Sequence, residues 1–246
     1  MKKKLRSDDY LPESIEIQCF IFDLDGTLAE TEEAHREAFN KAFNLNKLNW
    51  YWDQNVYKRL LQVAGGKERL EFYNKSFLSH PKQISSKDID EIYSHKNEFY
   101  SQLISQGFIQ LRPGIKKLLE KAKSNKKKLA IVTSTSRDNV NSLISVCLTE
   151  KKDIFSFIST GELVENKKPS PDLYNLVLAE MDLMPEECIA FEDSRIGLVS
   201  AKKANIKTVV IPSYYSVGDT FEEADYLLKS FLLEQFPKKL RKKLSL

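Results

Sequence analysis

Short apolar runs alternate with helical patterns along most of the chain. Each run is rich in β-branched or aromatic residues and is followed directly by turn residues, which is typical of buried strands. The predicted strands are residues 15–22, 128–133, 188–191 and 207–211. The predicted helices are residues 115–123, 137–147, 172–180 and 194–204. This alternation predicts an α/β fold with a Rossmann-like parallel sheet whose two faces are covered by helices.

The stretch 29–107 has a different pattern. It is rich in Glu, Lys, Phe and Tyr, and small and aromatic residues recur at helical spacing from Ala34 to Phe43. Thr31 is predicted to cap this helix, since two glutamates follow it in the first turn. We therefore expect residues 1–28 and 108–246 to form the core that contains the sheet, and residues 29–107 to form an inserted α-helical cap domain.

Composition narrows the class of protein. The 246 residues carry 38 Lys and Arg against 35 Asp and Glu, so charge gives no reason to expect nucleic acid as a partner. The five Lys and Arg of residues 238–246 are interpreted as a solvated or frayed helix end rather than a basic contact patch. No apolar window approaches the length of a membrane span, and no secretory signal is recognisable. The three scattered cysteines favour a reducing compartment, so we expect a cytoplasmic protein. We also expect a monomer that binds a small molecule and no membrane.

The first predicted strand ends in a pair of carboxylates. Asp23 and Asp25 lie two residues apart just after the apolar run and before Gly26-Thr27. In an open parallel sheet, ligands bind at the carboxyl ends of the strands, so both side chains can face one crevice. The alternative is structural, with the two aspartates capping a glycine turn.

Two other segments offer groups that suit a phosphate. The strand 128–133 leads into the hydroxyl residues 133–136, whose side chains and amides can bind phosphate oxygens, and Arg137 opens the next helix. Ser136 alone is better explained as the cap of that helix. Lys168 precedes a Pro-Ser-Pro turn that would hold it in place, although a loop lysine is usually solvated.

A further strand end adds two acids. Glu192 and Asp193 follow the run 188–191, which brings the number of carboxylates at this edge of the sheet to four. Buried like charges without a partner are costly, so convergence of these groups implies a cation. Ligation by oxygen alone suits Mg²⁺.

These motifs, in this order, resemble the haloacid dehalogenase superfamily of phosphatases and phosphomutases. The matching pieces are Asp23-x-Asp25-Gly26-Thr27, Thr133, Lys168-Pro169 and Glu192-Asp193. The helical insertion after the first motif is similar to the α-helical cap subclass of that superfamily. The segments 30–40, 65–69, 111–114 and 190–194 further resemble the CbbY group, which includes phosphatases of xylulose-1,5-bisphosphate and is related to β-phosphoglucomutase.

The resemblance implies a reaction through an aspartyl-phosphate. Asp23 would be the nucleophile and Asp25 the acid and base, which calls for an ionised Asp23 and a raised pKa of Asp25. Mg²⁺ would be held by Asp23, the backbone carbonyl of Asp25, Asp193 and, directly or through water, Glu192. The phosphoryl group would be held by Thr133, the Ser134 amide and Lys168.

Substrate choice is expected to come mainly from the cap. The candidate substrate-binding residues are Glu30, His35, Lys67, Arg69, Lys96 and Arg137. Two cap cations that face the site would suit a second phosphate, and Arg is the better bidentate partner. A solvated surface side chain is the alternative for each cap residue, and it is favoured for Lys96.

We therefore expect hydrolysis of xylulose-1,5-bisphosphate to xylulose-5-phosphate and phosphate. A phosphomutase of the β-phosphoglucomutase type would use the same residues but must keep its aspartyl-phosphate from water. A non-catalytic sugar-phosphate-binding regulator is the alternative from another class. The intact pair of Asp23 and Asp25 argues against it, because binding alone requires neither a nucleophile nor an acid.

Overall fold

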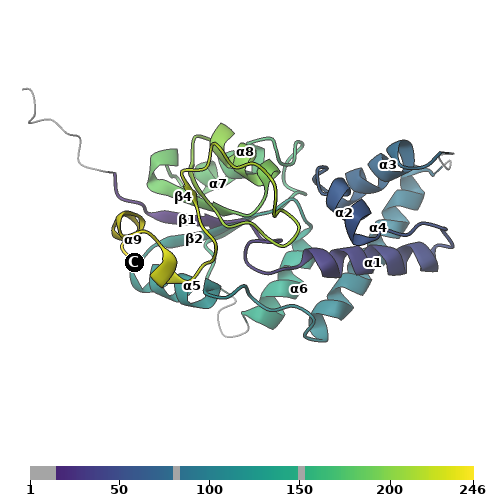
Figure 1. Cartoon of the computed structure of the whole chain (residues 1–246), viewed down its shortest axis with the longest axis horizontal. Coiled ribbons are helices and arrows are strands. Elements are labelled where there is room, and N and C mark those ends of the chain that lie inside the picture. The colour runs from purple at the N-terminus through teal and green to yellow at the C-terminus, as the bar shows by residue number, and fades with distance from the viewer. Residues whose placement is uncertain (1–14, 80–83, 149–152) are drawn as a thin grey trace, which may run out of the picture.

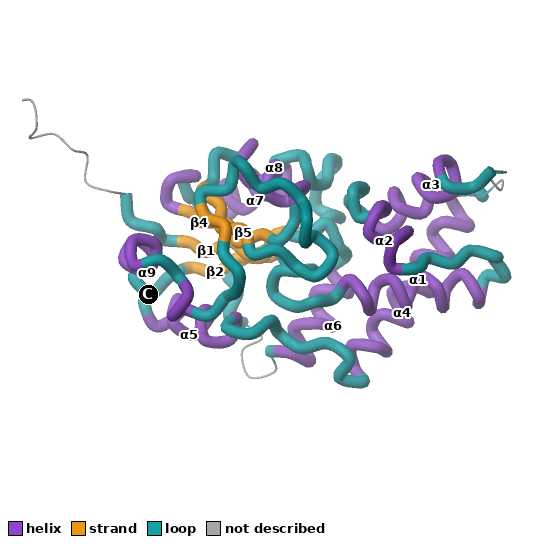
Figure 2. The backbone as a smooth tube through the Cα atoms, viewed as in Figure 1, coloured by secondary structure: helices purple, strands orange, loops and turns teal. Residues whose placement is uncertain are grey.

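A six-stranded parallel sheet forms the centre of the protein (Figures 1 and 2). The computed structural model describes residues 15–79, 84–148 and 153–246. The strands are β1 (Cys19–Phe22), β2 (Lys128–Val132), β3 (Phe157–Ser159), β4 (Cys188–Glu192), β5 (Lys207–Val210) and β6 (Tyr226–Leu227). Their order in the sheet is β3-β2-β1-β4-β5-β6, so the carboxyl ends of β1, β2 and β4 are neighbours. The predicted α/β class is confirmed.

Helices cover both faces of the sheet, as predicted. They are α5 (Ile115–Ser124), α6 (Arg137–Cys147), α7 (Asp172–Glu180), α8 (Arg195–Lys203) and α9 (Lys238–Leu244), with short 3₁₀ helices at Pro185–Glu187 and Leu233–Gln235. Alternate residues of β1 point to opposite faces. Phe20 and Phe22 pack in the cluster that holds α5, α6 and α9, whereas Cys19 and Ile21 pack in the cluster that holds α7 and α8 (Figure 1).

Four further helices lie to one side of the sheet (Figure 1). They are α1 (Glu32–Leu45), α2 (Gln54–Leu60), α3 (Gly66–Ser76) and α4 (Ser86–Ser105). Here they are called the cap helices. They share a third apolar cluster, in which Trp52 and Tyr57 are fully buried. The division of the chain at residues 28/29 and 107/108 remains a prediction.

The structure differs from the sequence-based predictions in four local ways. Strand β1 begins at Cys19 rather than at residue 15, and β3 and β6 were not predicted. Residues 1–14, predicted as part of the core, lie outside the described residues. The tail is a packed helix, because Leu240 and Leu244 of α9 are fully buried in the core. Thr31 occupies the cap position of α1, but its side chain makes no capping bond to the described backbone and donates to Asp25 instead.

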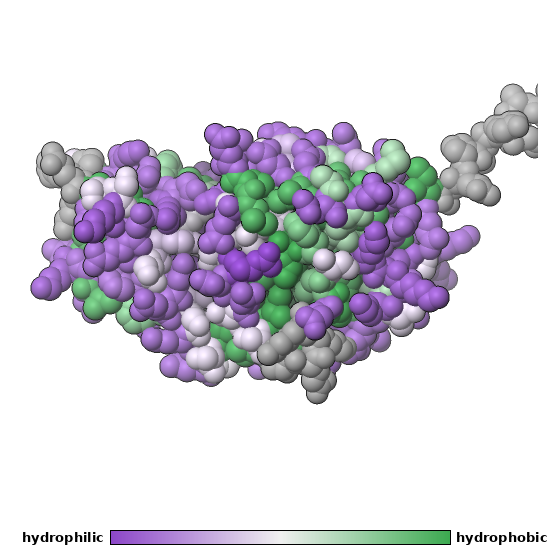
Figure 3. Space-filling model, turned by 180° about the vertical axis from the view of Figure 1, so that it is seen from behind, coloured by the Kyte–Doolittle hydropathy of each residue, from purple (hydrophilic) through white to green (hydrophobic). Residues whose placement is uncertain are grey.

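Hydrophilic side chains cover most of the face seen in Figure 3, with a hydrophobic band across its middle. The high share of charged residues, 30%, accounts for this surface. In the part of the chain that the structure describes, none of the helices combines the length and the apolar character that spanning a bilayer requires.

Candidate active site

The side chain of Lys168 joins the ends of three neighbouring strands. Its Nζ atom donates to Oδ1 of Asp23 at 2.6 Å, to Oε1 of Glu192 at 2.7 Å and to the carbonyl of Val132 at 3.1 Å. The three ends meet because β1 lies between β2 and β4. Burial alone would lower the pKa of Lys168, but the carboxylates of Asp23 and Glu192 outweigh it and raise that pKa above its ordinary value. The lysine is therefore a buried ammonium rather than a solvated loop residue.

Asp193 completes a cluster of three buried carboxylates. One oxygen from each of Asp23, Glu192 and Asp193 lies within 4.8 Å of the others. Burial raises the pKa of Asp23 to about 7, with Glu192 adding to the rise and Lys168 opposing it. Burial and the nearby Asp23 likewise raise the pKa of Asp193 well above its usual range. One ammonium does not neutralise this much buried negative charge.

The same cluster has free ligand atoms. Oδ2 of Asp23 and Oε2 of Glu192 are buried and find no hydrogen-bond partner among the described residues. Buried polar atoms are normally satisfied, so these two oxygens suit the ligation of a cation. Carboxylate oxygens are the donors that Mg²⁺ prefers. The cluster is thus a candidate magnesium site.

Asp25 lies on the cap side of the cluster and contacts α1. Its Oδ1 accepts a hydrogen bond from the Thr31 hydroxyl at 2.6 Å and lies 3.0 Å from Nε2 of His35. Burial, with Lys96 nearby, lowers the pKa of His35 to about 4, so the ring is neutral and donates this bond at pH 7. The ring also stacks on Tyr100, with their centroids 4.0 Å apart.

The pKa pattern of the two aspartates is the reverse of the one expected. Burial favours protonation of Asp25, but the bonds from His35 and Thr31 outweigh it and hold the pKa of Asp25 at about 2. Asp23, which was expected to be readily ionised, has a raised pKa. The reason is physical: Asp25 accepts two hydrogen bonds, whereas Asp23 is buried beside the carboxylate of Glu192.

The hydroxyl loop after β2 lies beside these groups. Thr133 is buried and its Oγ accepts from the Thr135 amide at 3.1 Å, and Oγ of Ser134 is buried without a partner among the described residues. Ser136 caps α6 by accepting from the Asn139 amide at 3.4 Å, as predicted. Arg137 turns away, since its guanidinium donates to the Ile158 carbonyl at 3.0 Å.

A cavity of about 780 Å³ opens between the cap helices and the sheet edge. Among the predicted site residues it is lined by Asp23, Asp25, His35, Arg69, Lys96, Thr133, Ser134, Lys168 and Asp193. Lys96 is only 2% exposed, so the prediction that its side chain is solvated is wrong. It is buried because the rings of Phe39, Tyr93 and Tyr100 lie 5.0–5.6 Å from its Nζ.

The other predicted cap residues make different contacts. Lys67 is not among the residues that line this cavity and forms an ion pair with Asp90 at 2.5 Å. Glu30 pairs with Arg112 at 3.2 Å where the cap helices join the core. Arg69 does reach the cavity, and its guanidinium donates to the carbonyls of Leu60 and Val63 and to the hydroxyl of Tyr57.

Sequence reasoning missed three cations that line the cavity, Lys58, Arg59 and Arg195. The first two lie in α2, where a Lys-Arg pair on a polar helix carries no specific signal. Arg195 directly follows the Asp193-Ser194 pair, and this adjacency to an acidic motif could have indicated it.

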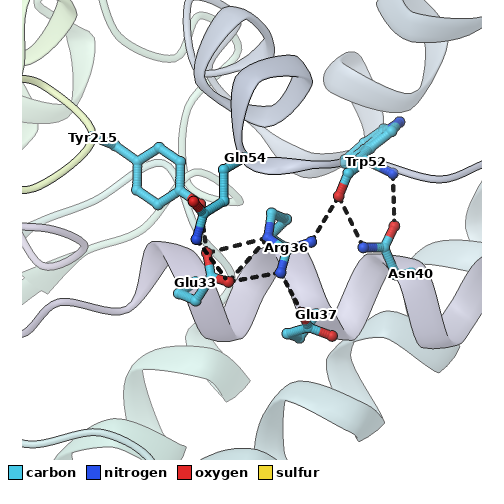
Figure 4. A network of polar contacts seen from close by, with 7 residues as sticks. All are labelled: Glu33, Arg36, Glu37, Asn40, Trp52, Gln54 and Tyr215. Atoms are coloured by element: carbon cyan, nitrogen blue, oxygen red, sulfur yellow. Dashed lines mark hydrogen bonds and ion pairs between the residues drawn. The ribbon is translucent and has the colours of Figure 1, made fainter.

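A polar network fastens the start of α1 to the core (Figure 4). Glu33 accepts from Arg36 on its own helix and from the hydroxyl of Tyr215 on the loop after β5. Arg36 and Asn40 both donate to the carbonyl of Trp52, at 2.8 and 2.9 Å. Because His35 lies in α1 and Thr31 occupies its cap position, the network also positions the donors that contact Asp25.

Comparison with known proteins identifies relatives of the whole arrangement. A family model described as haloacid dehalogenase-like hydrolase matches residues 20–211. The protein CbbY of Rhodobacter capsulatus is 43% identical over 213 residues, which cover 86% of this chain and 92% of that protein.

Solved structures agree with this relationship. A mutant CbbY of Rhodobacter sphaeroides in complex with xylulose-(1,5)bisphosphate superposes with a TM-score of 0.84 at 41% identity, over 88% of this chain and 96% of that one. The β-phosphoglucomutase of Clostridium difficile shares the fold, with a TM-score of 0.78 at 24% identity over 93% and 97% of the two chains.

Proposed function

The chain belongs to the haloacid dehalogenase-like hydrolases and is a sugar-phosphate phosphatase of that family, and we propose that it hydrolyses xylulose-1,5-bisphosphate to xylulose-5-phosphate and phosphate with Mg²⁺. The observation that carries this proposal is the cavity between cap and core. The cavity is lined by residues of the carboxylate cluster and Lys168 and by several cations of the cap helices. One phosphate can therefore react at the cluster while the cations bind a second phosphate. The structure of a CbbY relative in complex with this bisphosphate supports the choice of sugar.

Bound Mg²⁺ would be held by Asp23, Asp193, the backbone carbonyl of Asp25 and, directly or through water, Glu192. The orphaned oxygens of Asp23 and Glu192 support this ligand set. The ion would neutralise the carboxylate cluster and the charge on the transferring phosphoryl group. It would also favour the ionised form of Asp23, which is the form that the chemistry requires.

In the first step, Oδ of Asp23 attacks phosphorus, and the bond from phosphorus to the sugar oxygen breaks. The sugar oxygen takes a proton from Asp25, which the charge of the bound phosphoryl group would help to protonate despite its low pKa. In the second step a water attacks the aspartyl-phosphate and gives a proton to Asp25. The bond between phosphorus and Asp23 breaks, and the products are the sugar monophosphate, inorganic phosphate and a regenerated Asp23.

The phosphoryl group would be held by Lys168, the hydroxyl of Thr133 and the amide of Ser134. Two observations support this role: the buried Oγ of Ser134 has no hydrogen-bond partner among the described residues, and the ammonium of Lys168 is bonded to Asp23. These donors are fixed before the substrate arrives, so little reorganisation is needed in the transition state.

The second phosphate would be bound by cations of the cap. Arg69 and Lys96 line the cavity, together with Lys58 and Arg59. Arg69→Ala is expected to lower kcat/KM for the bisphosphate more than for a monophosphate. Lys67→Ala is the matched control, because Lys67 lies two residues away in α3 but pairs with Asp90 instead. Equal losses on both substrate types would exclude Arg69 from the second site.

The decisive experiment measures phosphate release with Mg²⁺ across a panel of substrates. The panel contains xylulose-1,5-bisphosphate, ribulose-1,5-bisphosphate, β-glucose-1-phosphate, fructose-1,6-bisphosphate and phosphoglycolate. We expect the highest kcat/KM for the xylulose compound. Preference for another compound overturns the substrate, and formation of glucose-6-phosphate without net phosphate release makes the protein a mutase.

A further inference from the structure

Tyr174 is a fully buried tyrosine whose hydroxyl reaches the carboxylate cluster. It is the third residue of α7, and its ring lies in the apolar cluster with Leu173 and Val177. The hydroxyl donates a hydrogen bond of 2.5 Å to Oε1 of Glu192. Phenylalanine would fill the same apolar space, so packing alone does not account for the hydroxyl.

Two donors converge on this single oxygen of Glu192. The hydroxyl of Tyr174 lies at 2.5 Å and Nζ of Lys168 at 2.7 Å. The same ammonium is bonded to Asp23 and lies 5.7 Å from the centre of the Tyr174 ring. Tyr174 therefore contacts both members of the Glu192–Lys168 pair. It stabilises the carboxylate without adding a charge that would compete with the lysine.

The other oxygen of Glu192 is positioned by the shape of α8. A Cβ atom at Gly197, in the first turn of that helix, would overlap with Oε2 of Glu192. The Gly197 amide is bonded to Oγ of Ser194 at 3.3 Å, which fixes the backbone at this point. The carboxylate is thus confined between a hydroxyl at one oxygen and a glycine at the other.

We propose that Tyr174 is a positioning residue, which holds Glu192 so that Lys168 remains bonded to Asp23 and the acidic cluster keeps its geometry. This inference rests on the proposed function, because it assigns Tyr174 to the reaction of Asp23 and Lys168. Without the hydroxyl, Lys168 is the only described donor that remains on Oε1 of Glu192. The ammonium is then drawn toward Glu192 and away from the nucleophile.

Steady-state kinetics of Tyr174→Phe with a sugar bisphosphate and Mg²⁺ test the proposal. We expect kcat to fall by about 10- to 100-fold, as for other residues that orient metal-site ligands, with KM unchanged. KM is unaffected because Tyr174 is not among the residues that line the cavity. Gly197→Ala places a methyl group against the other oxygen of the same carboxylate. It is expected to give the same result, a lower kcat with an unchanged KM. Tyr73→Phe, a buried tyrosine of the cap helices, is the control and keeps its kcat.

A second readout does not depend on activity. In a thermal-shift titration with Mg²⁺ alone, Tyr174→Phe is expected to unfold cooperatively but to need about 10-fold more Mg²⁺ than the wild type for half of the shift. Wild-type kcat together with a wild-type Mg²⁺ titration overturns the proposal, as does an equal loss in Tyr73→Phe. If the wild type releases no phosphate from any sugar phosphate, the proposed function fails, whereas the titration still decides whether Tyr174 positions Glu192.

Discussion

Lys168 donates a hydrogen bond of 2.6 Å to Oδ1 of Asp23, although the two residues are 145 positions apart in the sequence. Both side chains are buried, and the same ammonium also binds Glu192. One cation is therefore shared by two carboxylates at the junction of β1, β2 and β4. A buried ion pair adds little stability by itself, but removal of this shared cation leaves the carboxylates as uncompensated buried charges.

Lys168→Met is expected to lower the free energy of unfolding by about 3 kcal/mol at pH 7 in the absence of metal. Urea unfolding followed by circular dichroism measures this loss. The matched control is Lys167→Met, which removes the adjacent lysine and its 2.5 Å ion pair with the partly exposed Glu68. The control should lose less than about 1 kcal/mol, as exposed pairs do. Equal losses in the two variants would contradict the view that the buried cation stabilises the cluster.

Asp23→Asn is expected to lower kcat by three orders of magnitude or more, equivalent to about 4 kcal/mol of transition-state stabilisation. The amide is nearly isosteric but is a far poorer nucleophile toward phosphorus. The variant should also unfold at a temperature no lower than the wild type, because it removes one charge from the crowded carboxylate cluster. Phosphate release and a thermal melt on the same preparation separate loss of chemistry from loss of folding. Turnover at the wild-type rate would remove Asp23 from the reaction.

Removal of divalent metal is expected to lower the melting temperature, and Mg²⁺ should restore it. An ion that binds only the folded state stabilises it. When the metal is removed, the carboxylate cluster loses its counterion and the folded state loses this stabilisation. Asp193→Asn should abolish the Mg²⁺-dependent shift while raising the melting temperature of the metal-free protein. Glu186→Gln, an exposed carboxylate next to the amino end of β4, should leave the shift unchanged. A full Mg²⁺ shift in Asp193→Asn would exclude this metal site.

The sequence predicted those helices and strands whose ends are marked by capping or turn residues. The bounds of α6 and α7 agree with prediction because Ser136 caps one and the Pro-Ser-Pro turn precedes the other. The strands β3 and β6 were missed because two or three residues are too few for a hydrophobic pattern to emerge.

Features that depend on the packing of distant segments could not be predicted. The burial of Lys96 arises from three rings on two helices, and spacing along one helix does not reveal it. Similarly, Thr31 has the residue type of a helix cap, but its hydroxyl donates to the Asp25 carboxylate and accepts no capping bond from the described backbone. The order of the pKa values of Asp23 and Asp25 follows from burial and from these contacts.

The burial of Lys96 determines how the free energy of unfolding depends on pH. Burial, with Arg69 nearby, lowers the pKa of Lys96 to about 7 from its ordinary value of 10.5. Between these two pH values the folded protein binds fewer protons than the unfolded chain. The free energy of unfolding contributed by this group therefore rises as pH increases from about 7 to 10.5. At pH 7 and below, nearly the full cost of burying the ammonium is present.

Lys96→Met is expected to stabilise the protein by up to about 4 kcal/mol at pH 7, with a gain that shrinks as pH rises toward 10. The same variant should lose kcat/KM on the bisphosphate, because the cavity then lacks one of its cations. Chemical denaturation of both proteins at intervals from pH 6.5 to 10 measures the slope. Lys87→Met, an exposed lysine on the same helix, should follow the wild-type curve at every pH. Parallel curves for the wild type and Lys96→Met would contradict a lowered pKa of Lys96 in the folded protein.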